Sequence, residues 1–125
     1  MSKREKQAAT ERLRRDPRAL AAYRHLLEVA MARSTTTYGE LAERLGLPRR
    51  GTRMAREVGE VLDAISRYEA SHNRPLLSVL VFSATDKKPG RGFFALARRL
   101  GALGREEDEN CFYRLELGAV YHTWS

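Results

Sequence analysis

The chain has 125 residues, which suits one ordinary domain and is too short for two domains with separate cores. Hydrophobic residues make up 42% of the chain and charged residues 31%, so we expect a packed core, and a chain disordered throughout is excluded. The formal net charge of +7 makes a polyanion, nucleic acid above all, the first partner to consider.

The positive charge is concentrated in the first half of the chain. Residues 1–56 hold 14 basic and 6 acidic side chains, whereas residues 57–125 hold 9 and 10. We therefore expect a surface that binds a polyanion to draw mainly on the first half.

Cysteine, histidine and hydropathy patterns limit the kinds of site to expect. Cys111 is the only cysteine, so no internal disulfide can form, and three scattered histidines do not indicate a zinc site or another cofactor. No apolar run approaches the roughly 18 residues that span a bilayer. We expect a soluble, unprocessed, cytoplasmic protein without cofactors or membrane contact, associated with the nucleoid if it binds DNA.

The first predicted helix follows a charged N-terminal segment. Residues 1–15 are mostly charged or Ala, which predicts a basic mobile arm or a frayed helix outside a single domain of residues 16–125. Asp16 followed by Pro17 is typical of a helix start, because Asp accepts hydrogen bonds from free amides and Pro has no amide hydrogen to leave unpaired. Apolar residues then recur at helical spacing, so this helix is predicted to run to about Arg33.

Two further helices are predicted around a turn. Thr37 and Glu40 have capping-box spacing, which indicates the start of a short helix. Gly46 ends that helix, because glycine readily adopts the left-handed conformation of a C-terminal cap. After the turn, Thr52 can cap a long amphipathic helix that runs to about Ser71.

The remaining segments are shorter. Residues 76–82 form a compact apolar run with β-branched members, which predicts a buried strand, and residues 85–92 form a basic turn. Residues 93–100 fit either a return strand or a helix that stops at Gly101. A final helix is predicted over residues 106–124. Its core-facing residues are expected to be Phe112, Leu115, Ala119 and Val120.

This order of elements is typical of a helix-turn-helix followed by a wing. We therefore expect a mostly helical α+β fold: a winged-helix-like helix-turn-helix with a short β-hairpin, flanked by N- and C-terminal helices.

Five arginines lie within thirteen residues around the predicted turn, with no acidic residue among positions 44–56. They are Arg44, Arg49, Arg50, Arg53 and Arg56. A guanidinium contacts phosphates or guanine edges in bidentate fashion, and a helix N-terminus adds amides to the same surface. The alternative is a solvated arginine-rich face without a partner. Clustering at one turn favours nucleic-acid binding.

A second basic group lies in the predicted hairpin. Lys87, Lys88 and Arg91 follow the predicted strand among turn residues, where the wing of a winged helix would touch phosphate or enter a minor groove. The alternative is a hairpin tip that only aids solubility.

Residues with catalytic potential do not form a convincing set. Asp63 and Asp86 with Lys88 match only a loose nuclease spacing of a kind that often arises by chance. Cys111, between Asn110 and Phe112, is interpreted as a small buried hydrophobe. We expect no enzymatic activity.

Three motifs in residues 37–94 resemble those of one known family. Thr37-Tyr38-Gly39-Glu40-Leu41-Ala42 is similar to T-Y-G-x-[LIV]-A, Arg56-Glu57-Val58-Gly59 with Leu62 to R-x-V-G-x-x-L, and Gly90-Arg91-Gly92-Phe93 to a G-x-G-F stretch. The family is that of the O6-alkylguanine-DNA alkyltransferases and the alkyltransferase-like proteins, in their C-terminal winged-helix domain. The resemblance covers under half of the chain. It implies that Tyr38 crowds the DNA backbone near a flipped nucleotide and that Arg56 enters the base stack.

The chain departs from this family at the reactive position. Pro75-Leu76-Leu77-Ser78-Val79 stands where the family carries its P-C-H-R-V motif with the acceptor cysteine. Without that thiol and the adjacent histidine the resemblance excludes alkyl transfer, and the residues that build the base-flipping pocket have no counterpart.

We therefore expect a non-catalytic protein that binds duplex DNA. The expected contact residues are Tyr38, Arg49, Arg50, Thr52, Arg53, Arg56, Lys87, Lys88 and Arg91. Two alternatives stay open: a small regulator or inhibitor that binds a protein partner through its basic face, and a structure-specific RNA binder. The aromatic C-terminal segment could also support a homodimer, although core packing is the commoner use of such residues.

Overall fold

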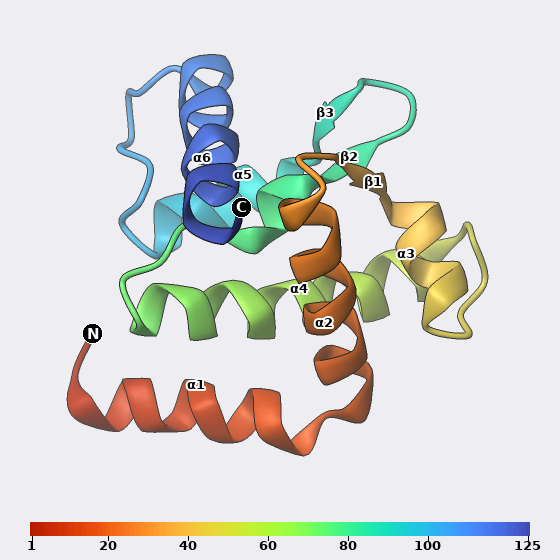
Figure 1. The fold of residues 1–125 in the computed structure, drawn as a ribbon, viewed down its shortest axis with the longest axis horizontal. Coiled ribbons are helices and arrows are strands. Elements are labelled where there is room, and N and C mark those ends of the chain that lie inside the picture. The colour runs from red at the N-terminus through yellow and green to blue at the C-terminus, as the bar shows by residue number, and fades with distance from the viewer.

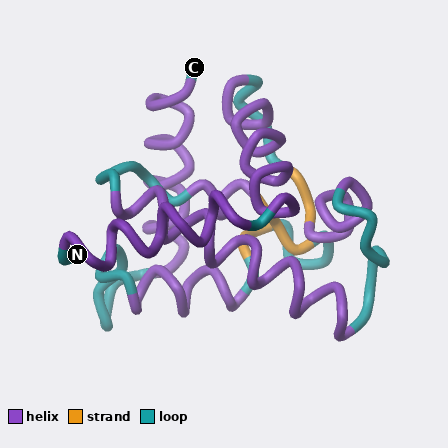
Figure 2. Tube along the Cα trace, turned by 90° about the horizontal axis from the view of Figure 1, so that it is seen from below, coloured by secondary structure: helices purple, strands orange, loops and turns teal.

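A computed structural model describes all 125 residues and confirms a mostly helical α+β fold (Figure 1). The α-helices are α1 (Lys3–Arg15), α2 (Pro17–Met31), α3 (Tyr38–Arg44), α4 (Thr52–Ser71), α5 (Arg91–Arg99) and α6 (Glu109–Trp124). One 3-10 helix, η1, spans Leu77–Leu80, and the strands are β1 (Thr36–Thr37), β2 (Val81–Ser83) and β3 (Lys88–Pro89). Figure 2 shows how little of the chain is extended.

The three strands form one small sheet in the order β1-β2-β3. β1 runs parallel to β2, with Thr36 opposite Val81, and β2 runs antiparallel to β3, with Ser83 opposite Lys88. The sheet therefore joins the start of α3 to a β2–β3 hairpin, although the two segments lie far apart in the sequence.

Helix α4 is the centre of the fold, because it packs against α1, α2, α3 and η1. Its apolar stripe, predicted from the sequence, lies in the core, where Val58 and Ile65 are fully buried. Residues 76–81 pack against it and are almost completely excluded from solvent.

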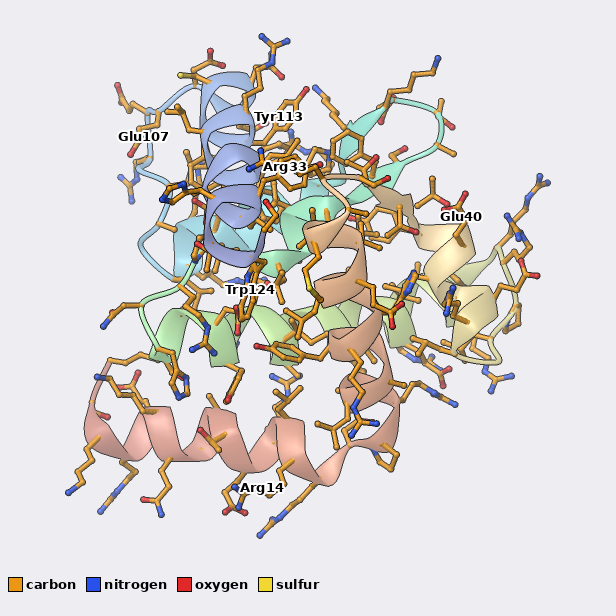
Figure 3. The ribbon with its side chains drawn as sticks, in the orientation of Figure 1. Arg14, Arg33, Glu40, Glu107, Tyr113 and Trp124 are labelled. Atoms are coloured by element: carbon orange, nitrogen blue, oxygen red, sulfur yellow. The ribbon has the colours of Figure 1, made fainter.

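The N-terminal segment is a helix, one of the two expected alternatives, but it packs on the core and is not an arm outside the domain. Residues 3–15 form helix α1, which lies antiparallel to α4 along its length (Figure 1). Leu13 is buried in the common core, and the Arg12 guanidinium donates to the Asp63 carboxylate at 2.6 Å. Figure 3 shows Arg14, by contrast, pointing away from α4 on the outer side of α1. Helix α1 is therefore held in place by the side that contacts α4 and the core, although the charged composition of the segment alone suggests a mobile arm.

The predicted strand over residues 76–82 is wrong for most of its length. Residues 77–80 form η1, and only residues 81–83 are extended. Inside η1, the Ser78 hydroxyl lies 2.6 Å from that of Ser66 in α4. A segment buried on every side needs apolar residues at each position, so its pattern does not distinguish a strand from a tight turn of helix.

After the hairpin, the C-terminal part of the chain forms two helices joined by a connector. Residues 93–99 belong to helix α5, so the helical alternative is correct, and Gly101, with a φ of 78°, follows the C-cap Leu100. Helix α6 begins later than predicted, because the Asp108 carboxylate caps it by accepting from the Asn110 amide. Two expectations about α6 are wrong: Leu115 is 71% exposed and Cys111 is exposed, since both lie on the side of the helix turned away from the core.

A buried ionic cluster connects α2, α4 and α6. Glu69 of α4 is fully buried, and its carboxylate accepts from Arg74 at 2.9 Å and from the Tyr23 hydroxyl at 2.7 Å. The Arg74 guanidinium lies over the rings of Tyr68 and Trp124, and Figure 3 shows Trp124 at the end of α6 nearest α4. The hydrogen bonds to Glu69 raise the pKa of Arg74 above its usual range, so the Arg74 guanidinium keeps its charge.

A second carboxylate ties α6 to the core, and it predicts a pH dependence of stability. Glu116 accepts a hydrogen bond from the Leu76 amide at 2.9 Å, and its burial raises the pKa of the Glu116 carboxyl. The unfolded chain therefore releases this proton more readily than the folded protein. Protonated Glu116 therefore stabilises the folded protein below the unfolded pKa of about 4.5. This contribution to the free energy of unfolding is lost as the pH rises through the folded pKa.

Glu116→Gln removes this titration and keeps an oxygen that can accept from the Leu76 amide. We expect the variant to have a higher free energy of unfolding than the wild type at pH 7 and a similar one near pH 4. Urea unfolding at a series of pH values measures the difference. A variant that is less stable at pH 7, or that loses stability with pH as steeply as the wild type, would contradict the prediction.

Candidate nucleic-acid interface

The short helix α3 begins with a side-chain cap, as predicted. The Thr37 hydroxyl accepts from the Glu40 amide at 3.2 Å. The Glu40 carboxylate does not complete the capping box, because it accepts from the Thr36 hydroxyl at 3.0 Å instead. Gly46 ends the helix region at a φ of 73°, which is the left-handed conformation expected of it.

The start of α4 differs from the prediction. Thr52 is the first helical residue and caps nothing, while Gly51 takes the capping position at a φ of 101°. Glycine alone among residues adopts such a φ without strain. The amides of Thr52, Arg53 and Met54 therefore have no hydrogen-bond acceptor in the protein. An uncapped N-terminus leaves these donors and the positive end of the helix dipole available to an anion.

Four of the predicted arginines surround this helix start, and we call them the arginine turn. They are Arg49 and Arg50 in the connector and Arg53 and Arg56 in the first two turns of α4, and all four are exposed. Arg49 pairs with Glu43, and Arg53 lies 3.4 Å from the Glu57 carboxylate. Arg50 and Arg56 pair with no carboxylate. Exposed ion pairs are weak, so Arg49 and Arg53 can exchange theirs for phosphate, and Arg50 and Arg56 have no ion pair to give up.

The hairpin cations lie at different places. Lys87 is at the hairpin tip with a φ of 55°, and Lys88 is half-buried in β3. Arg91 begins α5, and its highly exposed side chain lies 3.0 Å from Glu109.

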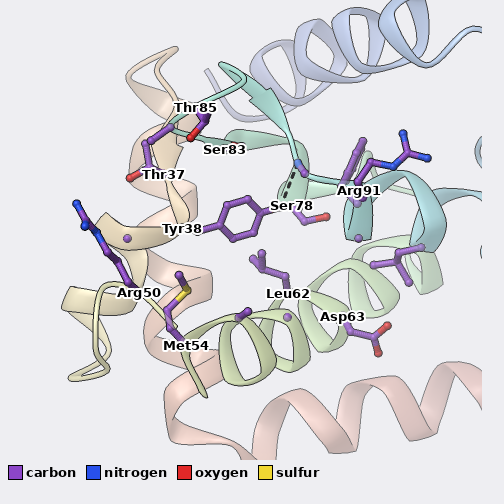
Figure 4. A pocket seen from close by; sticks show the side chains of 18 of the residues that line it. Thr37, Tyr38, Arg50, Met54, Leu62, Asp63, Ser78, Ser83, Thr85 and Arg91 are labelled. Carbon is purple, nitrogen blue, oxygen red and sulfur yellow. Dashed lines mark hydrogen bonds between the residues drawn. The ribbon is translucent and has the colours of Figure 1, made fainter. Parts of the chain in front are cut away.

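A cavity of about 740 Å³ separates the arginine turn from the hairpin and α5, and we call it the Tyr38 cavity (Figure 4). Of the predicted site residues, those that line it are Tyr38, Arg49, Arg50 and Arg91. The predicted residues outside its lining are Thr52, Arg53, Arg56, Lys87 and Lys88. Sequence reasoning missed Arg99, whose position on the cavity wall follows from the packing of α5 and has no sequence signal.

Tyr38 reaches from α3 into the middle of the cavity, with Met54 and Leu62 of α4 on one side (Figure 4). Its hydroxyl oxygen accepts from the Gly90 amide at 3.2 Å. Burial raises the pKa of Tyr38, so the phenol stays neutral at physiological pH. The residue thereby connects α3 to the segment that follows β3.

This contact predicts that Gly90→Ala is destabilising. A Cβ at Gly90 would lie 2.7 Å from the Tyr38 hydroxyl oxygen, and overpacking of this kind costs about 1–3 kcal/mol. Denaturant unfolding measures the loss. Gly92→Ala is the matched control, because a Cβ there meets nothing within 4 Å. Adding Tyr38→Phe to Gly90→Ala should restore part of the stability. Equal stability of the two alanine variants would contradict the prediction.

The segment 75–79, which departs from the motif of the resembled family, is part of the core. Leu76 and Leu77 are buried, and Ser78 reaches the cavity wall while its hydroxyl contacts that of Ser66. Cys111 does not line the cavity. Asp63 does, and although burial alone would raise its pKa, hydrogen bonds from the Arg12 and Arg67 guanidinium groups lower the pKa of this carboxyl overall. Both guanidinium groups donate to Oδ2 of Asp63, so this carboxylate is already paired with two cations.

The chain matches no protein-family model, no curated protein and no solved structure at a significant level. No group of three or more His, Cys, Asp or Glu side chains is arranged to hold a metal ion. None of the helices combines the length and the apolar character needed to cross a membrane.

Proposed function

We propose that the protein binds duplex DNA without catalysis, through a winged-helix-like unit of α3, the connector, α4 and the β2–β3 hairpin. In this arrangement α4 is the recognition helix and the hairpin is the wing. The resemblance of residues 37–94 to the alkyltransferase family is part of the same proposal.

The observation that carries the proposal is the uncapped start of α4 within the arginine turn. Three free amides, the positive end of a 20-residue helix dipole and four exposed guanidinium groups meet there. Helix N-termini and arginines are the groups that proteins use to hold DNA phosphates. Arg50 and Arg56 need to give up no ion pair in order to bind, which makes them the principal contacts.

We propose no catalytic activity because the residues that line the cavity do not form a catalytic set. Its wall holds no thiol and no histidine, its one carboxylate is held by two arginines, and the Ser78 hydroxyl is paired with Ser66. No nucleophile there has a base beside it.

Fluorescence anisotropy with labelled duplex DNA, single-stranded DNA and duplex RNA tests the proposal. With four to six phosphate contacts, log Kd against log salt should change with a slope of about 4 to 5 between about 50 and 200 mM salt. Tighter binding of duplex DNA than of the other two nucleic acids is the expected result. Preference for RNA would support the RNA alternative. Absence of binding to all three would reject nucleic-acid binding and leave a protein partner for the basic face.

A further inference from the structure

We propose that the Tyr38 cavity is a binding site for a small aromatic anion, meaning a planar ring that carries a phosphate or carboxylate group. Its volume of about 740 Å³ lies in the range of about 300–1,000 Å³ that is usual for small-molecule sites. Side chains from α3, α4, the hairpin and α5 all face it, so it is a feature of the whole fold.

The walls offer apolar surface to a ring. Met54 and Leu62 come from α4, and Phe93 and Leu96 come from α5. These two pairs belong to two different helices that bound the cavity, so a ring bound there can contact apolar surface from both α4 and α5. Apolar walls with a few polar groups are what small-molecule sites present.

The charges that face the cavity favour an anion. Arg49, Arg50, Arg91 and Arg99 line it, and Asp63 is the one acidic residue among its lining side chains. The Asp63 carboxylate lies 2.6 Å from Arg12 and 2.9 Å from Arg67, so it does not neutralise the cavity arginines. Arg50 and Arg99 have no carboxylate partner in the protein. A phosphate or carboxylate can therefore take bidentate hydrogen bonds from either of them.

Two helical glycines that packing does not require face the same space. Gly59 lies within α4 and Gly92 within the first turn of α5, and a Cβ at either position would meet nothing within 4 Å. Glycine inside a helix is less stable than alanine, and neither residue has a positive φ. An empty position over each glycine lets a ligand approach the helix backbone closely, which is a recognised use of glycine.

The proposal does not depend on DNA binding, and its test contains no DNA. Isothermal titration calorimetry of the full chain uses two anionic probes, guanosine 5′-monophosphate and 2-naphthoate, and their uncharged counterparts, guanosine and 2-naphthol. We expect at least one anion to bind with a Kd below about 1 mM and its uncharged counterpart to bind at least tenfold more weakly. Binding of the nucleotide alone indicates a nucleotide ligand, whereas binding of naphthoate indicates an aromatic acid.

Three variants test whether the probe binds in the Tyr38 cavity. Gly59→Leu fills the space over α4 and should lower probe affinity at least tenfold, while its unfolding midpoint is equal to or above that of the wild type. Arg50→Gln with Arg99→Gln should abolish the preference for the anion. Arg105→Gln, an exposed arginine outside the cavity, is the matched control and should leave affinity unchanged. Failure of both anions to bind at millimolar concentration, or unchanged affinity in Gly59→Leu, would overturn the proposal.

Discussion

Arg74→Met is expected to lower the free energy of unfolding by about 3 kcal/mol. The substitution leaves the Glu69 carboxylate fully buried with one remaining partner, the Tyr23 hydroxyl. Removing one member of a buried ion pair costs about 3–5 kcal/mol, and the lower end applies because the Arg74 side chain is 27% exposed. Domains of this size are stable by only about 5–15 kcal/mol, so the loss is a large fraction of the total.

Urea unfolding of three variants separates the buried charge from a general loss of arginine. Arg67→Met removes a partly buried ion pair with Asp63, but the Asp63 carboxylate keeps Arg12 as its partner, so the loss should be about 1 kcal/mol or less. Glu69→Leu with Arg74→Met removes both charges, and it should be more stable than Arg74→Met alone, because no unpaired charge remains in the core. If Arg67→Met and Arg74→Met cost the same, the Glu69 cluster does not stabilise the fold as we infer.

Three helix ends could be predicted from the sequence, because local chemistry determines them. The Asp16 carboxylate accepts from the Arg18 and Ala19 amides, and Gly46 and Gly101 both adopt left-handed conformations after a helix. Each of these contacts involves residues within a few positions of one another. The sequence therefore contains nearly all the information that sets these helix ends.

Where prediction failed, contacts between distant residues decide the structure. Residues 3–15 are ordered by contacts with α4, about fifty positions away along the chain. The segment 76–80 turns within the core, with the Leu76 amide held by Glu116 of α6. Hydrophobic periodicity describes one segment at a time, so it cannot reveal a contact between distant segments. A charged helix therefore resembled an arm, and a buried turn resembled a strand.

The same division applies to the candidate site. The arginine turn could be predicted because its residues are neighbours in sequence. The Tyr38 cavity could not, since it combines α3, α4, the hairpin and α5, and the contribution of Arg99 depends on how α5 packs. Gly59 looked like part of a motif in the sequence, and only the structure shows that its missing side chain leaves open space.

Arg50→Gln with Arg56→Gln is expected to weaken duplex DNA binding at least tenfold and to leave the free energy of unfolding almost unchanged. These two arginines are chosen because neither has a carboxylate partner. Substituting Arg49 would instead leave Glu43 unpaired, and substituting Arg53 would leave Glu57 with Arg18 as its one partner. Either change would add carboxylate charge that repels phosphate by itself. Loss of two phosphate contacts should also lower the slope of log Kd against log salt by about 2.

Anisotropy titrations at several salt concentrations measure both quantities, and a control with the same net charge is essential. Arg14→Gln with Arg105→Gln removes two exposed arginines that lie on other faces, on α1 and on the α5–α6 connector. If the arginine turn contacts DNA directly, this control should change the affinity much less than the Arg50/Arg56 variant does. An equal loss in both variants would mean that affinity follows net charge alone, because long-range attraction does not distinguish the faces of a small basic protein, whereas direct phosphate contacts do.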